Sequence, residues 1–164
     1  QQIDPNRQFQ EALYAGKTEE LLGLLHDNYD NKSEEERLLD INLPPVNTSG
    51  NRPIHVAAAT GLREVVVALL ERGVDVDSSG GLGNTCLHYA ARHDHIQVLA
   101  ELICRGAKLD VANVKGLTPI EMATSLQAKG LLSGGIEPAE ILNAVNETAT
   151  DGSTSPMPAP EGKR

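Results

Sequence analysis

The middle of the chain repeats itself at a spacing of 33 residues. The three copies read NRPIHVAAATG, NTCLHYAARHD and LTPIEMATSLQ, and they align without an insertion or a deletion. Small residues recur in register through all three copies: Gly50, Gly83 and Gly116, followed by Ala57, Ala90 and Ala123. A fixed period of this length predicts a stack of supersecondary units, because one such unit cannot bury its apolar face without a neighbour.

Each copy predicts the start of a helix pair. Pro53 and Pro119 stand at the first helical position, where the missing N–H is not needed. In the first two copies a second helix carries an apolar stripe at i, i+3 and i+4 spacing. The members of the stripe are Val65, Val66, Leu69 and Leu70, then Val98, Leu99, Leu102 and Ile103. Gly73 and Gly106 follow these helices, at positions that favour a positive φ.

Aromatic residues are scarce, with one Phe, three Tyr and no Trp among 164 residues. Large rings dominate many globular cores and form the stacking platforms that bind single-stranded nucleic acid. A stack of helix pairs has a thin core, which Ala, Val, Leu and Ile can fill between neighbouring units. The scarcity therefore agrees with the repeat and argues against a compact sandwich or an RNA-stacking sheet.

The repeated segments resemble the ankyrin repeat, whose signature is Thr-Pro-Leu-His-x-Ala at this period. The resemblance covers residues 47–126, about half of the chain. It implies an all-α solenoid of stacked helix pairs, with short β-hairpin fingers between the units. In this family the histidine is structural, and Thr85 supplies a hydroxyl partner for His88. The chain departs from the pattern at Arg52, which replaces the threonine, and at Glu121, which replaces the histidine.

The repeat pattern decays toward both ends of the chain. An upstream segment matches the first helix pair at a shift of 45 residues, which predicts an N-terminal cap followed by an insertion. Downstream, glycines interrupt the apolar pattern, so the third copy is expected to lack its second helix. An ankyrin-like domain at 1–149 is therefore expected to consist of a cap at 5–28, an insertion at 29–46, repeats at 47–79, 80–112 and (partial) 113–127, and an irregular cap at 128–149. The Ser/Pro-rich tail at 150–164 is expected to be disordered.

No pattern in the chain predicts catalysis or a cofactor site. His88, His93 and His95, with Cys86 and Cys104, are the candidates for a metal cluster, but a zinc site needs about four converging ligands. The repeat positions of both cysteines predict small buried side chains instead. We therefore expect a protein that is not an enzyme and that holds no metal or other cofactor.

The resemblance implies a protein-binding adaptor or scaffold, expected to be monomeric, that uses its concave surface and finger tips. The contact residues, carried over by position, come from all three copies: Thr48, Ser49, Asn51 and Thr60; Gly81, Leu82, Asn84, Arg92 and His93; Val114, Lys115 and Leu117. Leu82, Val114 and Leu117 are apolar where polar turn residues are expected. Such side chains either mark an interaction site or pack against the neighbouring finger.

The formal charge of −9 is concentrated at the N-terminal end. Residues 1–45 hold ten acidic and four basic side chains, whereas residues 46–125 hold eight and seven. A solvated face explains the excess, and so does a second hypothesis: an acidic chaperone or inhibitor that masks a basic, nucleic-acid-binding protein. That hypothesis assigns the contacts to five acidic residues: Asp27, Asp30, Glu34, Glu35 and Glu36.

The same acidity argues against direct binding to nucleic acid or to an anionic membrane. No apolar run reaches the length of about 18 residues that a membrane span needs. The first ten residues lack the apolar stretch of a secretory signal, and two cysteines fit a reducing compartment. The expected location is therefore cytoplasmic or nuclear.

Overall fold

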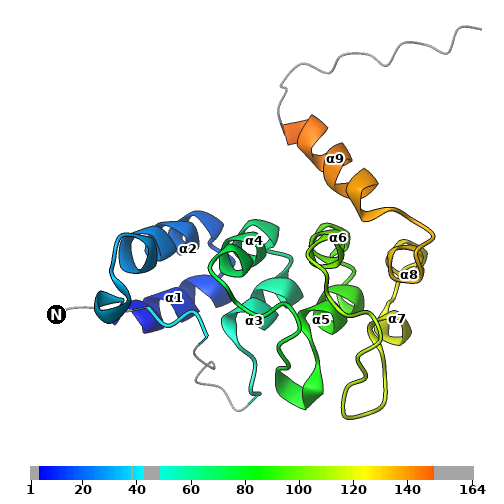
Figure 1. The fold of residues 1–164 in the computed structure, drawn as a ribbon, viewed down its shortest axis with the longest axis horizontal. Helices are drawn as coiled ribbons and strands as arrows, with labels where there is room; N and C mark the ends of the chain where they lie inside the picture. The colour runs from blue at the N-terminus through cyan, green and yellow to red at the C-terminus, as the bar shows by residue number, and fades with distance from the viewer. Residues whose placement is uncertain (1–3, 38, 43–48, 150–164) are drawn as a thin grey trace, which may run out of the picture.

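The computed structural model describes residues 4–37, 39–42 and 49–149, with side chains to residue 144. Helix pairs stand side by side in two layers (Figure 1). The layer nearer the fingers consists of α1 (Pro5–Tyr14), α3 (Pro53–Thr60), α5 (Cys86–Arg92) and α7 (Pro119–Met122). The outer layer consists of α2 (Thr18–Leu25), α4 (Arg63–Glu71), α6 (Ile96–Cys104) and α8 (Leu126–Ser133). The predicted helical solenoid is confirmed.

The core runs along the stack between the two layers and is built from small aliphatic side chains. The paired alanines of α3 and α5 are fully buried: Ala57, Ala58, Ala90 and Ala91. Because alanine is small, these helices approach each other closely, and α3 contacts α5 as α5 contacts α7. The single phenylalanine, Phe9, is also buried, within the N-terminal helix pair. The core therefore needs few aromatic rings.

The fingers are hairpin turns, and no residue in the described ranges is assigned to a β-strand. The expectation of β-hairpins is therefore wrong in detail. The third finger closes with a bond from the Asn113 amide to the Leu117 carbonyl at 2.9 Å. The Asn113 side-chain oxygen accepts from the amides of Lys115 and Leu117. Side-chain oxygens thus occupy backbone donors that a β-ladder would use.

The predicted N-terminal helix pair forms, and it packs on the first repeat through α1 against α3 and α2 against α4. The chain continues from α2 into a π-helical turn, η1 (His26–Asp30), and then a 3₁₀ turn, η2 (Glu34–Glu36). Arg72 of the first repeat forms an ion pair with Asp30. Leu39 and Ile41 are buried, so this part of the insertion contributes to the core.

The third repeat does have a second helix, α8, and the prediction that it lacks one is wrong. Ser125 caps α8 by accepting a hydrogen bond from the Ala128 amide at 3.0 Å. Gly134 ends the helix with a left-handed backbone, φ 80°. Gly130 was expected to interrupt the helix. A Cβ at Gly130 would lie 2.7 Å from Ile136 Cδ1, so its lack of a side chain instead gives Ile136 room to pack.

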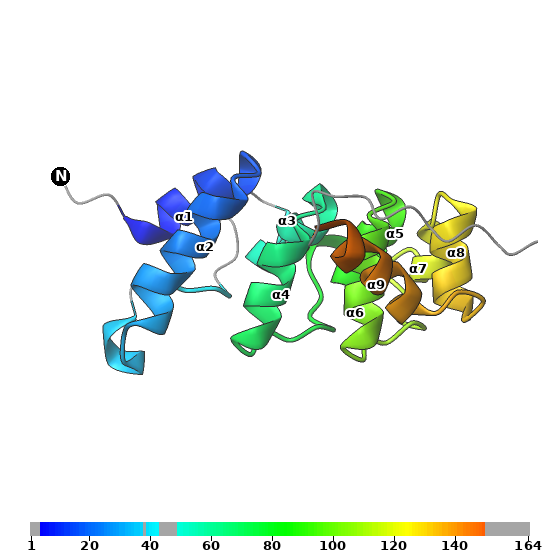
Figure 2. The ribbon, with the colours of Figure 1, turned by 90° about the horizontal axis from the view of Figure 1, so that it is seen from above.

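The last helix, α9 (Pro138–Ala149), leaves the row of helix pairs. Figure 2 shows it lying over α6, on the face of the outer layer. Ile141 and Leu142 of α9 pack against the core with part of their surface exposed. No helix in the described part of the chain combines the length and apolar character that crossing a membrane requires.

Candidate interaction surface

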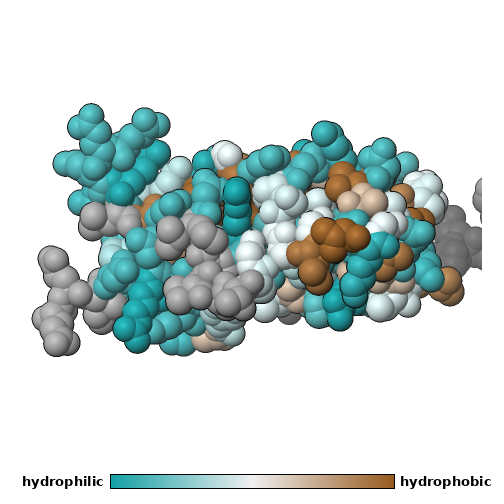
Figure 3. Space-filling view, turned by 90° about the horizontal axis from the view of Figure 1, so that it is seen from below, coloured by the Kyte–Doolittle hydropathy of each residue, from teal (hydrophilic) through white to brown (hydrophobic). Residues whose placement is uncertain are grey.

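Two apolar side chains are exposed at the tips of the second and third fingers. Leu82 is 62% exposed and Val114 is 71% exposed. The Val114 amide donates a hydrogen bond to the Leu82 carbonyl at 3.0 Å, so the two tips lie side by side. Figure 3 views this side of the molecule, and hydrophobic residues gather over its right half while hydrophilic residues dominate the left. Val114 is therefore not tucked away against the neighbouring finger.

Leu82 has a left-handed backbone, with φ 59° and ψ 22°. This conformation costs a leucine about 1–2 kcal/mol, a cost that glycine and, in part, asparagine avoid. The preceding residue, Gly81, is confined because a Cβ there would lie 2.0 Å from the Ser49 carbonyl oxygen. Close packing of the first two fingers thus fixes the turn. A strained and exposed apolar residue is more typical of a binding site than of a packing contact.

A hollow of about 390 Å³ opens beside these finger tips and α7. Its lining combines apolar, charged and amide or hydroxyl side chains: Leu82, Leu117 and Met122; Arg92, Lys115 and Glu121; Asn84, Asn113 and Thr124. Five of these nine residues are among the predicted contact residues. The structure therefore brings together Leu82, Asn84, Arg92, Lys115 and Leu117 on one face of the second and third repeats.

Leu117 is held in place by the structural histidine of the preceding repeat. His88 Nε2 donates to the Leu117 carbonyl at 3.0 Å, and His88 Nδ1 accepts from the Thr85 amide at 3.0 Å. His55 bonds the Ser78 carbonyl in the same way, at 2.8 Å. Both rings are fully buried and each fastens a helix start to the next finger. These histidines are therefore structural supports of the surface.

Because Arg52 stands where the repeat has threonine, His55 lacks a hydroxyl partner, but its ring is still hydrogen-bonded. His55 Nδ1 still accepts from the Arg52 backbone amide at 3.0 Å. Burial is the main cause of a lowered pKa at both His55 and His88, with backbone hydrogen bonds acting in the opposite direction. Both rings are thus held neutral, with the proton on Nε2, where the carbonyl acceptors lie.

Glu121 replaces the histidine chemically as well as by position. Its Oε2 accepts from the Thr118 amide at 2.7 Å and from the Thr118 hydroxyl at 2.8 Å. These hydrogen bonds, led by the backbone amide, lower the pKa of the Glu121 carboxyl. The carboxylate therefore caps α7, and one of its oxygens is already engaged.

Three predicted contact residues have internal roles. Asn84 is only 5% exposed, which corrects its prediction as an exposed contact, and its Oδ1 accepts from Asn113 Nδ2 at 2.9 Å. Asn51 Oδ1 accepts from the Gly81 amide at 2.8 Å and from the Tyr89 hydroxyl at 2.6 Å. Asn51 and Gly81 thus join the first and second fingers. The sequence alignment could not separate these roles from partner contacts.

Three other predicted contact residues lie on the surface without joining the hollow. Ser49, Thr60 and His93 are exposed, and Thr48 lies outside the described residues. The Thr60 hydroxyl donates back to a carbonyl of its own helix, at 2.8 Å. The His93 ring stacks on His95, with 6.1 Å between ring centroids.

Sequence reasoning missed four residues of the hollow: Asn113, Glu121, Met122 and Thr124. Met122 aligns with Val56 and Tyr89 at the repeat period, and Val56 is buried, so the alignment gives no sign of a surface role for Met122. The third copy differs because α7 ends at Met122, and Ala123 then adopts an extended backbone with ψ 130°. This early end of the helix leaves Met122 lining the hollow.

The two cysteines lie in different environments, one buried and one exposed. Burial raises the pKa of the Cys86 thiol to about 12, which disfavours the thiolate that reacts or binds metal. Cys104 is exposed, so the prediction that it is buried is wrong. It ends α6 and aligns with Glu71, which is also exposed. Within the described residues no three His, Cys, Asp or Glu side chains form a group that could hold a metal ion.

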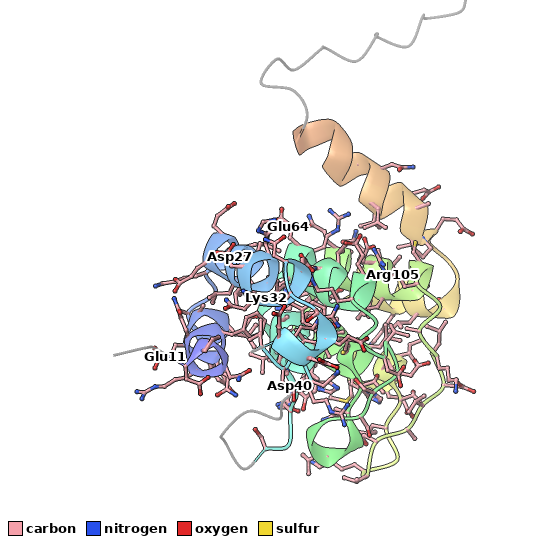
Figure 4. The ribbon with its side chains drawn as sticks, turned by 60° about the vertical axis from the view of Figure 1, so that its left-hand side comes forward. Glu11, Asp27, Lys32, Asp40, Glu64 and Arg105 are labelled. Carbon is pink, nitrogen blue, oxygen red and sulfur yellow. The ribbon has the colours of Figure 1, made fainter. Side chains whose placement is uncertain are left out.

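The acidic N-terminal end carries charges that are partly used inside the molecule. Figure 4 views this end, with Asp27, Lys32 and Asp40 projecting near α2 and the segment that follows it. Asp30 is paired with Arg72, and the Glu34 carboxylate lies 3.9 Å from the Arg37 guanidinium. Two of the five acidic residues assigned to a basic partner are therefore already paired with an arginine, and the Ser33 hydroxyl donates to a third, Glu36, at 3.0 Å.

A family model described as "Ankyrin repeats (3 copies)" matches residues 10–113 and 54–139 of the chain. These matches include the helix pairs and fingers described above. The N-terminal helix pair falls partly within the first match, which agrees with its packing against α3 and α4.

Three curated proteins are each similar to part of the chain. An ankyrin and IPT/TIG repeat-containing protein of Schizosaccharomyces pombe is 40% identical over 80 residues, which is 49% of this chain and 7% of that protein. Ankyrin repeat domain-containing protein 40 of Mus musculus is 35% identical over 85 residues, 51% of this chain and 23% of its own. The E3 ubiquitin-protein ligase XBAT33 of Arabidopsis thaliana is 34% identical over 125 residues, 70% of this chain and 24% of its own. The chain thus spans less than a quarter of the length of each.

Proposed function

The chain belongs to the ankyrin repeat family, and from this premise we propose that it is a non-enzymatic module that binds another protein on the finger side of its second and third repeats. Ankyrin repeats generally bind other proteins, and the match contains only such repeats. The enzymatic name of one relative belongs to a protein of which this chain spans 24%. A ligase activity is therefore not carried over.

The observation that carries the proposal is the exposed pair Leu82 and Val114 at two bonded finger tips. Exposed apolar groups that gather on one face mark interaction sites, and bulky anchors in such sites supply most of the binding energy. The left-handed backbone of Leu82 adds to this argument, because asparagine or glycine would satisfy the turn with less strain.

The test compares partner capture with stability. The full chain is immobilised, and proteins retained from a cell extract are identified for the native sequence and for the double variant Leu82→Asn with Val114→Thr. We expect the specific partner to be lost. Thermal unfolding of Leu82→Asn alone is expected to give an unchanged or higher Tm, because asparagine tolerates the left-handed backbone better than leucine does.

A matched control is Leu109→Asn, which changes an exposed leucine outside the hollow. It is expected to retain the partner. Retention of the same partner by the finger-tip double variant would contradict the proposal. The proposal would also be contradicted if the double variant lost the partner only because it had unfolded. In that case a finger-tip variant that stays folded, such as Leu82→Asn alone, would still bind the partner.

A second candidate function is the masking of a basic partner by the acidic end. Glu34, Glu35 and Glu36 are all exposed, and residues 1–45 carry ten acidic against four basic side chains. The two functions predict different sites of action. If the acidic end masks a basic partner, changing the three glutamates to glutamine should weaken the binding of that partner. If the partner binds on the finger side, the same change should leave its affinity unchanged.

A further inference from the structure

We propose that the hollow beside the second and third finger tips and α7 takes an acidic peptide segment, in which a carboxylate side chain lies beside a bulky apolar one. This inference rests on the proposed protein-binding function and specifies the chemistry of the partner. It follows from which side chains line the hollow and from how their charges are satisfied within the molecule.

The apolar part of the hollow suits a bulky side chain. Leu82, Leu117 and Met122 line it, and Leu82 keeps 62% of its surface exposed in the free molecule. Leu117 is fixed by the bond from His88 to its carbonyl, so this wall is held before a partner arrives. Burying an exposed leucine against a partner side chain removes apolar surface from water, which favours association.

The charged part of the hollow is set by two cations. Within the described residues, six basic side chains form ion pairs with Asp or Glu: Arg7, Lys17, Arg37, Arg63, Arg72 and Arg105. Arg92 and Lys115 form none, although both line the hollow. These two cations are thus available to an incoming carboxylate.

The carboxylate of Glu121 in the same lining does not satisfy these cations by an ion pair. Its Oε2 is engaged by two donors of Thr118, the amide and the hydroxyl. The lining therefore carries two cations against one anion in a chain whose formal charge is −9. An acidic segment is repelled by the molecule as a whole and attracted here, which directs it to this place.

The test uses the full chain and three capped nine-residue peptides of defined sequence. GSELFDLSG carries two carboxylates among apolar residues, GSQLFNLSG replaces them with amides, and GSKLFKLSG replaces them with lysines. Binding is followed by methyl NMR at Leu82, Leu117 and Met122. We expect saturable chemical-shift changes with the acidic peptide. The amide and basic peptides are expected to bind about fivefold or more weakly than the acidic peptide.

Two double variants test whether the preference for the acidic peptide comes from the cations of the hollow. Each variant removes two positive charges, so both change the total charge equally. Arg92→Gln with Lys115→Gln is expected to abolish the preference for the acidic peptide over the amide peptide. Lys108→Gln with Lys129→Gln, at exposed cations outside the hollow, is expected to retain it. Unchanged Tm values exclude an effect through folding.

Three outcomes overturn the inference: equal affinities for the acidic and amide peptides, tighter binding of the basic peptide, or no shift at the methyl groups of Leu82, Leu117 and Met122 with any peptide. A captured partner that is lost with Leu82→Asn but unaffected by Arg92→Gln and Lys115→Gln would refute the acidic preference and leave the protein-binding function standing. If neither set of substitutions reduced binding of the captured partner, both the acidic preference and the finger-side binding function would be refuted.

Discussion

At the scale of single residues, one position of the repeat performs the same task with two chemistries. His55 and His88 accept a helix-start amide on Nδ1, and Glu121 accepts one on a carboxylate oxygen. The histidines also donate from Nε2 to the next finger, to Ser78 and Leu117. A carboxylate has no proton to donate in this way, so Glu121 caps its helix without fastening a following finger.

Replacing the buried histidine should cost more than replacing an exposed one. His88→Ala is expected to lower the free energy of unfolding by about 1–3 kcal/mol, because it leaves the buried Thr85 amide and the Leu117 carbonyl without their bonds. His93→Ala is the matched control, and a change within about 0.5 kcal/mol is expected at that exposed site. Urea unfolding measures both, and equal losses would show that His88 is not a structural support.

The neutral histidines should make stability depend on pH in a defined window. Burial lowers the pKa of His55 and His88 from an ordinary value of 6.5, so the unfolded chain binds more protons than the folded one just below that value. The stabilisation is complete above pH 6.5 and is lost as the pH falls below it. The urea concentration at the unfolding midpoint should therefore fall as the pH is lowered from 7.5 to 6.5 and then to 5.5. Nitrogen NMR shifts showing charged rings in the folded protein at pH 6.5 would contradict this.

At the scale of elements, the two complete repeats follow from the sequence and the third does not. The proline positions, the alanine pairs and the apolar stripe predict α3 to α6, since each feature recurs at the period. α8 was missed because Gly130 has a low helix propensity by itself. Glycine is favoured at position 130 because Ile136 packs against it, and this contact exists only in the folded chain.

Gly130 therefore offers a test in which propensity and packing predict opposite signs. Helix propensity predicts that Gly130→Ala stabilises by about 1 kcal/mol. Because the new Cβ would lie 2.7 Å from Ile136 Cδ1, we expect destabilisation of about 1 kcal/mol instead. In a background of Ile136→Val, which removes that atom, the same change should become neutral or stabilising. Unfolding free energies of the four proteins give the coupling directly.

The candidate surface was predicted better in its location than in its roles. Alignment to the repeat placed Leu82, Arg92 and Lys115 on one face, because tip positions recur. It could not separate Asn84, which bonds Asn113, from a contact residue. Nor could it show that Leu82 has a positive φ or that α7 ends early beside Met122, since both depend on packing between repeats.

At the scale of the whole molecule, a charge network ties two repeats together across the outer layer. Glu101 on α6 is 8% exposed and accepts from Arg63 of α4 at 3.3 Å and from Arg105 at 2.9 Å. Since each repeat contacts only its neighbours, such a tie affects the cooperativity of the stack as well as its stability.

Removing this tie should weaken the stack measurably. Glu101→Gln is expected to lower the free energy of unfolding by about 1–2 kcal/mol, because two partly exposed guanidinium groups lose a nearly buried partner. Glu71→Gln removes an equal charge from an exposed carboxylate 3.8 Å from Arg105, and a loss below about 0.5 kcal/mol is expected. Denaturant titration compares them, and equal losses would mean that burial of Glu101 has no energetic role.

The path of α9 has a practical consequence for how the molecule can be tethered. Because α9 lies over α6, on the side opposite to the fingers, the chain that continues past residue 149 starts from the back of the proposed binding face (Figure 1). A fusion partner joined directly at residue 149 would start behind the stack, on the side away from the fingers. The fold thus separates the direction of attachment from the direction of recognition.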